Sequence, residues 1–188
     1  IVNGETTVKG NIVINKADNV TIEGLKVVAT DTTAPVIHMI DSDDVNIINN
    51  TVIAQGYASI GTSTGPARVT GKISGNSVTG MIIVGTAGDL EVSYNEVNLT
   101  ETSTEGICFA PVVSTAVITV IGNQIGQVRD GFAQIKVEHK PVSVNGETNE
   151  VDILSAISED NNGATAKLTW IKTVGEDAYA DYANIQAA

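Results

Sequence analysis

Short runs of β-branched residues alternate with polar turns along most of the chain. Five six-residue segments have Val, Ile or a similar β-branched residue at their first and sixth positions, and four of the five carry Asn at the fourth. They recur about every 24 residues, which is the signature of a repeat architecture. The segments are residues 22–27, 47–52, 73–78, 92–97 and 120–125.

A second apolar patch precedes each of these segments, so each repeat is expected to hold two or three short strands. Strands this short cannot each bury a face alone, and they have to stack. When coils of chain lie about 4.8 Å apart, each strand pairs with the strands above and below it, and like side chains form ladders. The patches are residues 11–14, 36–40, 58–60, 81–84, 107–110 and 132–135.

The recurrent asparagines are predicted to form one such ladder. Asn tolerates a left-handed backbone conformation, and its amide can hydrogen-bond the equivalent side chain of the next coil. A column of Asn therefore suits a bend that is repeated in every coil. The predicted members are Asn50, Asn76, Asn95 and Asn123.

Residues 10 to about 140 resemble the right-handed parallel β-helix of the pectin-lyase-like superfamily. The opening segments, residues 1–6, 11–16 and 19–24, resemble the first coil of that superfamily. The resemblance implies an all-β fold, with about six short coils over residues 1–137. It does not choose a function, since the superfamily includes pectate lyases, polygalacturonases, phage tailspikes and adhesins.

Residues 138–188 break the period and are predicted to cap the coils. The Asn145-Gly146 pair between apolar residues 142–144 and 151–154 predicts a hairpin. Alternating residues 164–170 predict a further strand, which completes a small antiparallel β cap. A capping box at residues 173–176 then predicts a short terminal helix.

The last seven residues, 182–188, resemble the amphipathic segment that precedes the first coil in many superfamily members. The order of elements therefore looks circularly shifted. This suggests the hypothesis that the chain is one unit of a tandem array, cut near a module boundary. A plain C-terminal capping helix is the alternative.

Composition supports the strand prediction and limits the partners. The chain has 24 Val and 22 Ile against only 5 Leu, a ratio typical of strands rather than helices. Its net charge of −12 argues against nucleic acid and anionic membrane surfaces as partners. No apolar run approaches the roughly 20 residues that a bilayer requires, so membrane insertion is not expected. The single Cys108 lies in an apolar run and is predicted to be a buried, inert thiol.

Residues that could carry catalysis do not match the enzymes of the superfamily. A lyase that holds Ca²⁺ needs carboxylates on successive coils, whereas Asp41, Asp43 and Asp44 share one turn. They predict either a solvated turn or a weak Ca²⁺ site. Neither His38 nor His139 neighbours a plausible nucleophile; His38 is expected in a ladder or facing outward, and His139 at the surface.

Aromatic residues offer a faint signal for carbohydrate binding, because sugars stack on exposed rings. Tyr57 and Tyr94 are candidates for glycan contact on exposed loops. Phe109, Phe132 and Trp170 are expected to pack.

The sequence therefore favours a non-catalytic, extracellular module of a surface or surface-layer-type repeat protein, with a structural or adhesive role. Its expected partners are neighbouring modules of the same protein or cell-surface glycans, and no cofactor other than the possible Ca²⁺ is expected. Two alternatives stay open. One is a fragment of a polysaccharide lyase or glycoside hydrolase, and the other is a glycan-binding module.

Overall fold

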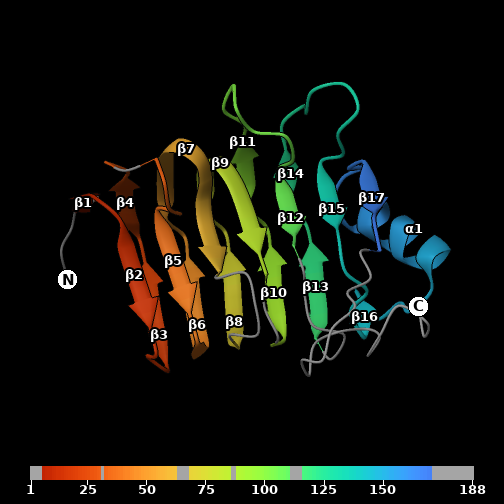
Figure 1. The fold of residues 1–188 in the computed structure, drawn as a ribbon, viewed down its shortest axis with the longest axis horizontal. Helices are drawn as coiled ribbons and strands as arrows, with labels where there is room; N and C mark the ends of the chain where they lie inside the picture. The colour runs from red at the N-terminus through yellow and green to blue at the C-terminus, as the bar shows by residue number, and fades with distance from the viewer. Residues whose placement is uncertain (1–5, 31, 63–67, 86–87, 111–115, 171–188) are drawn as a thin grey trace, which may run out of the picture.

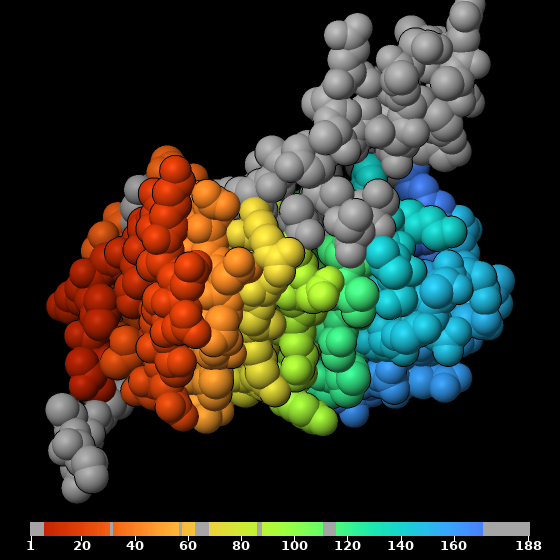
Figure 2. Space-filling view, turned by 90° about the horizontal axis from the view of Figure 1, so that it is seen from below, coloured from red at the N-terminus to blue at the C-terminus, as the bar shows by residue number. Residues whose placement is uncertain are grey.

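The chain folds into a parallel β-solenoid of about five turns, with one short helix among the described residues. The computed structural model describes residues 6–30, 32–62, 68–85, 88–110 and 116–170. Successive coils follow one another along the long axis, as the colour bands of Figures 1 and 2 show. The predicted all-β fold is confirmed, with about five turns against the six that the repeats suggested.

One face of the solenoid is a six-stranded parallel sheet. Four of its six strands lie just before a bend that carries a recurrent Asn. The strands, in hydrogen-bonded order, are β3 (Val20–Glu23), β6 (Ser42–Ile48), β8 (Val69–Ser74), β10 (Leu90–Ser93), β13 (Val117–Ile121) and β16 (Ser143–Val144).

The other eleven strands form a second sheet that is folded into two strips. The long strands β7 (Thr51–Thr62) and β9 (Ser77–Val84) run through both strips and join them. Strip 1 follows the Asn bend and contains the first halves of β7 and β9 with β1 (Thr6–Lys9), β4 (Leu25–Val28), β11 (Glu96–Asn98) and β14 (Gln124–Ile125). Strip 2 contains their second halves with β2 (Ile12–Asn15), β5 (Ile37–Ile40), β12 (Ile107–Phe109), β15 (Ile135–Val137) and β17 (Ala166–Leu168).

The core consists of stacked aliphatic columns, because residues in register on neighbouring strands point the same way. One column places Ile22, Ile47, Ile73, Val92 and Val120 on five successive coils. The last four of these side chains are fully buried. β-Branched residues suit such columns, since their stiff χ1 angles fit a pleated surface at little entropic cost.

A helix, α1 (Glu150–Asp160), closes the C-terminal end of the core. Its buried residues Ile153 and Ile157 lie one helical turn apart and face strands β13, β16 and β17. The Asn149 side chain caps the helix by accepting a hydrogen bond from the Asp152 amide. The predicted strand at residues 151–154 is therefore wrong. The N-cap and the four-residue spacing of the buried isoleucines outweigh the strand propensity of Val151.

The antiparallel cap is only partly present. The predicted Asn145-Gly146 turn is confirmed, with positive φ angles of 51° and 85°, and a single antiparallel bridge joins Val144 to Glu147. The strand predicted at residues 164–170 forms as β17, but it pairs in parallel with β15 and continues strip 2. The predicted terminal helix lies outside the described residues. Within the described part of the chain, no helix is long and apolar enough to span a membrane.

Candidate functional site

The bend between the six-stranded sheet and strip 1 is the most regular polar feature of the solenoid. In five coils, the residue just before the bend position, which is Leu25 in the first coil and the recurrent Asn in the other four, adopts a left-handed conformation with φ between 54° and 69°. Only Gly, or a residue such as Asn that tolerates this region, fits there at low cost, although one coil uses a Tyr. These residues are Gly24, Asn49, Gly75, Tyr94 and Gly122.

The Asn side chains inside this bend form a continuous ladder, as predicted. The backbone amide and side-chain amide of Asn76 both donate to Oδ1 of Asn95, at 3.1 and 2.9 Å. Asn95 donates to Asn123 in the same way, at 3.0 Å for both bonds. Asn50 donates likewise to Asn76, and the amide of Leu25 donates to Asn50 at 3.0 Å, which starts the ladder.

The ladder has one member that the sequence pattern missed. Asn161 follows α1 as its C-cap residue, and its Oδ1 accepts both the backbone and the side-chain amide of Asn123, at 3.1 and 2.8 Å. The Asn161 side chain then donates to carbonyls of Val120 and Ile157. The helix cap is thereby bonded into the same column that holds the coils. The Asn161-Asn162-Gly163 run is a turn signal, but it lies outside the 24-residue period that predicts the other members.

The three aspartates considered for Ca²⁺ lie in one turn, and one of them is bound by a cation of the protein. Asp43 accepts hydrogen bonds from Arg68 Nε at 2.9 Å and from the Thr70 hydroxyl at 3.0 Å. The bond from Arg68 is the main reason that the pKa of Asp43 lies below its usual value. Asp44 accepts a hydrogen bond from the amide of Asn46.

The described residues contain no group of three or more His, Cys, Asp or Glu side chains placed to hold a metal ion. Asp41, with a positive φ of 45°, serves the turn between β5 and β6. The weak Ca²⁺ site at Asp41, Asp43 and Asp44 stays a prediction, and Ca²⁺ would have to compete with Arg68 for Asp43.

Of the two tyrosines proposed for glycan contact, Tyr94 is exposed at the Asn bend. Its ring lies over Gly122 of the next coil, where a Cβ atom would come within 2.4 Å of Tyr94 Cδ1. The side chain is still 64% exposed. The ring therefore covers the bend on one side and presents an open face to solvent. The side chain of Tyr57 lies outside the described residues.

Strip 2 carries a charge cluster that sequence reasoning did not find. Lys136 Nζ lies 2.5 Å from Glu138 Oε1 and 3.7 Å from Glu105 Oε1. Glu105 is 7% exposed, although it lies on the outer side of the solenoid. The parallel pairing of β12 with β15 places Lys136 beside Cys108 and next to both carboxylates. No short sequence motif predicts this cluster, because the lengths of the loops between coils determine which residues become neighbours.

The chemistry of this cluster favours charge neutralisation over reactivity. The hydrogen bond that Lys136 donates to Glu138 raises the pKa of Lys136, so the amine stays protonated and is a poor base near neutral pH. Burial, with help from Glu138 and Glu105, raises the pKa of the Cys108 thiol to about 12. A thiol with that pKa has almost no thiolate at neutral pH and is not an effective nucleophile.

The two histidines lie apart, on the strip 2 side of the coil. His38 is half-buried on β5 between the buried residues Ile37 and Met39, and partial burial lowers its pKa, so the ring is neutral at pH 7. The predicted surface position of His139 is wrong, since this residue is only 5% exposed. The inward alternation of Ile135 and Val137 on β15 continues through His139.

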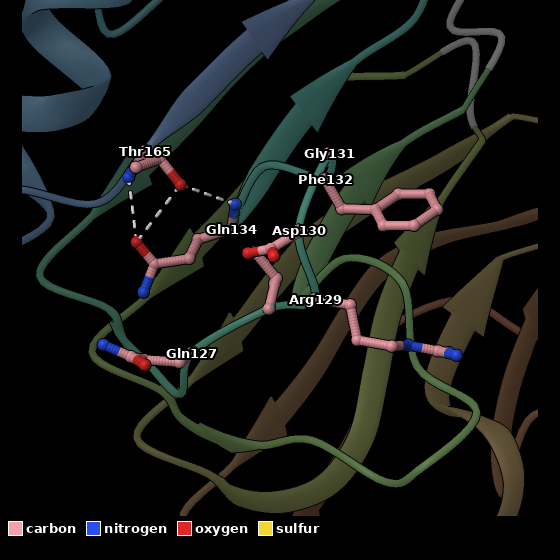
Figure 3. A pocket seen from close by; sticks show the side chains of 8 residues that line it. Gln127, Arg129, Asp130, Gly131, Phe132, Gln134 and Thr165 are labelled. Atoms are coloured by element: carbon pink, nitrogen blue, oxygen red, sulfur yellow. Dashed lines mark hydrogen bonds between the residues drawn. The ribbon is translucent and has the colours of Figure 1, made fainter.

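A shallow pocket of about 290 Å³ opens on the loop between β14 and β15 (Figure 3). Reciprocal bonds hold its floor: the Gln134 amide donates to the Thr165 hydroxyl at 3.0 Å, and the Thr165 amide donates to Gln134 Oε1 at 2.9 Å. Phe132 is 44% exposed at the rim, so the expectation that it packs is wrong. Arg129 anchors the loop by donating to the Ser103 carbonyl.

Comparison with known proteins returned no match among protein-family models, curated proteins or solved structures.

Proposed function

We propose that the chain is a non-catalytic, extracellular module of a surface or surface-layer-type repeat protein, related to the pectin-lyase-like superfamily. Its task in this proposal is to form a stiff, soluble structural unit between neighbouring modules or against cell-surface glycans. One observation carries the proposal. The buried polar side chains of the ladder hydrogen-bond one coil to the next.

The ladder illustrates this use most clearly. Each of the four predicted Asn side chains has its Oδ1 and Nδ2 atoms bonded to groups of adjoining chain, and all four are at most 2% exposed. Buried amides that are fully bonded fix register and rigidity, and they leave no group free to meet a substrate. A rigid rod is what a spacer requires.

The titratable groups on the surface support the same role. Lys72 and Glu91 are paired at 2.8 Å across the β8–β10 rung, and Arg68 is paired with Asp43 across the β6–β8 connection. Each pair joins consecutive coils. The raised pKa values of Lys136 and Cys108 move both groups away from the range in which a general base or nucleophile works.

An activity screen tests the non-catalytic part of the proposal. The chain would be incubated with pectin, alginate and chondroitin, with and without Ca²⁺, and followed by ultraviolet absorbance for unsaturated products and by reducing-end release. We expect neither signal above that of heat-inactivated protein. Turnover that is lost in Lys136→Met would overturn the proposal and indicate a polysaccharide lyase or hydrolase. Surface labelling of intact cells that carry the natural protein tests its location.

Glycan binding is a second candidate function, and the pocket in Figure 3 favours it. The half-exposed Phe132 lines this pocket together with Arg129, Asp130 and Gln127; in Figure 3 the Phe132 and Arg129 side chains point to one side, and Asp130 and Gln127 lie on the other. Sugars are commonly held by an aromatic ring and polar side chains that line one pocket. This site is separate from the tyrosines that the sequence suggested.

A glycan array with matched variants tests this second function. If the pocket binds sugar, Phe132→Ala abolishes retention while Val142→Ala, which removes a comparably exposed apolar side chain, preserves it. If Tyr94→Ala abolishes retention instead, the binding site is the Asn bend. Absence of retention for the wild-type chain removes glycan binding and leaves the structural role.

A further inference from the structure

The two ends of the solenoid are built differently. At the N-terminal end, strands β1, β2 and β3 each pair with a strand on one side only within the described chain. A parallel strand at an edge presents unpaired N–H and C=O groups that another surface can meet. At the opposite end, α1 lies across the last strands and covers the core (Figure 1).

Several core columns end in partly exposed side chains at the N-terminal end. Val20 and Ile22 are partly exposed, although their register partners on the next coil, Val45 and Ile47, are fully buried. Likewise, Ile12 is partly exposed, although its register partner on the next coil, Ile37, is fully buried. The residues are of the same kind and in the same columns, but among the described residues no further coil packs on Ile12, Val20 and Ile22. The end of the rod is thus a partly exposed apolar surface ringed by strand edges.

Helix α1 has a second face that points away from its own core. Val151 is 73% exposed and Leu154 is 37% exposed, one helical turn apart. Asp152 and Glu159 are exposed as well, on the flank of the helix away from Leu154. The helix therefore presents apolar and acidic groups to solvent, at the far end of the rod from β1.

Charge makes the two ends complementary. Residues 6–28 at the N-terminal end carry three lysines against two acids, in a chain whose net charge is −12. Lys9 and Lys16 are exposed there. Helix α1 carries four acids and no base. Opposite charges on two apolar surfaces favour encounter between the ends and disfavour pairing of like ends.

We propose that the N-terminal end of one copy docks on the outer face of α1 of a second copy, so that modules join head to tail along the solenoid axis. The helix then caps two cores at once, its own through Ile153 and Ile157 and that of the next copy through Val151 and Leu154. This inference rests on the proposed structural function and names its partner. Such an interface is heterologous, and it yields open chains of copies rather than closed dimers.

Complementary variants of the full chain test the docking. The head variant, Lys9→Glu with Lys16→Glu, reverses charge at the N-terminal end. The tail variant, Val151→Glu with Leu154→Glu, places charge on the outer face of α1. Val117→Glu is the matched control, since Val117 is 38% exposed on the side of the rod. Circular dichroism establishes that each variant is folded before sedimentation is measured.

Sedimentation velocity over a range of protein concentrations gives the result. We expect the wild type and Val117→Glu to form dimers and longer species as concentration rises, more weakly at high salt. Each variant alone loses at least about tenfold in association constant. An equimolar mixture of head and tail variants forms a species that stops at two copies, because it has one intact head facing one intact tail.

Two outcomes overturn the docking. The first is a wild type that stays monomeric at every concentration. In that case, either another part of the same chain covers the N-terminal end of the solenoid, or no second copy binds there. The second is self-association that both variants retain, or that the mixture fails to restore, which indicates a different interface. Neither outcome affects the proposed structural role, which instead fails if the chain turns over a polysaccharide.

Discussion

The side-chain amide of Asn123 donates a hydrogen bond of 2.8 Å to Oδ1 of Asn161, although 38 residues and a helix separate the two in sequence. This bond ties the helical cap to the column of amides that runs through the coils. The cap and the solenoid are consequently expected to unfold together.

Removing a rung from the middle of the ladder is predicted to be costly. In Asn95→Ala the two donors of Asn76 lose their acceptor inside a buried bend, and the free energy of unfolding should fall by about 3 kcal/mol. Asn98→Ala, three residues away on an exposed position, should cost under about 0.5 kcal/mol. Urea unfolding measures both. Equal losses for the two variants would mean that the ladder contributes little.

The last rung should couple the helix to the coils. Asn161→Ala removes the acceptor for both amides of Asn123 and the C-cap of α1, and should cost about 2 kcal/mol. We expect amide hydrogen exchange to rise within α1 and at Asn123 together. The control is Ser155→Ala on the exposed face of the helix, which should leave both unchanged. Faster exchange in α1 alone would contradict the coupling.

The sequence predicted the ladder because each of its first four members lies in a local pattern that repeats. Asn161 could not be found in this way, since α1 replaces a coil and breaks the period. The helix itself was mistaken for a strand, although Asn149 and the spacing of Ile153 and Ile157 are helical signals.

The residue clusters on the outer surface could not be predicted from local sequence patterns, for a different reason. Glu105, Cys108 and Lys136 become neighbours only through the pairing of β12 with β15, and that register depends on the length of the intervening loop. The exposure of Phe132 likewise follows from the path of its loop. Column-forming residues repeat in sequence, whereas these neighbours do not.

A close backbone approach at Gly71 should make that position intolerant of any side chain. Its φ is 129°, and a Cβ there would lie 2.1 Å from the carbonyl oxygen of Val45, next to the irregular pairing of β6 with β8. Gly71→Ala should lower stability by about 3 kcal/mol or more. Gly131 also has a positive φ of 89° but open space around it, so Gly131→Ala should cost about 1–2 kcal/mol. Thermal unfolding distinguishes them, and the reverse order would contradict the packing.

Acid should weaken the coil-to-coil ion pairs. The hydrogen bond from Lys72 is the main cause of the lowered pKa of Glu91. A carboxyl group with a lowered folded-state pKa contributes stability above its unfolded-state pKa, and that contribution is lost as pH falls through the folded-state value. The wild type should therefore be more stable than Glu91→Gln at pH 7, and the difference should shrink and then disappear as the pH falls below the lowered pKa of Glu91. A difference that persists in acid would show that charge is not its source.

The Cys108 thiol should resist alkylation in the folded chain. With a pKa of about 12, its thiolate is scarce at neutral pH, and burial further restricts access. Iodoacetamide at pH 8 should modify it at least a hundredfold more slowly than in urea-unfolded chain. Mass spectrometry of timed samples measures this ratio. Similar rates in both states would place the thiol at an open surface.

The ladder is tested most directly by hydrogen exchange of the side-chain amides, followed by NMR. If the solenoid is held as described, the Nδ2 protons of Asn50, Asn76, Asn95 and Asn123 exchange as slowly as backbone amides of the core, while those of the exposed Asn98 exchange at once. Fast exchange at all five positions would show that the amides do not stack from coil to coil, and would contradict the account of the fold.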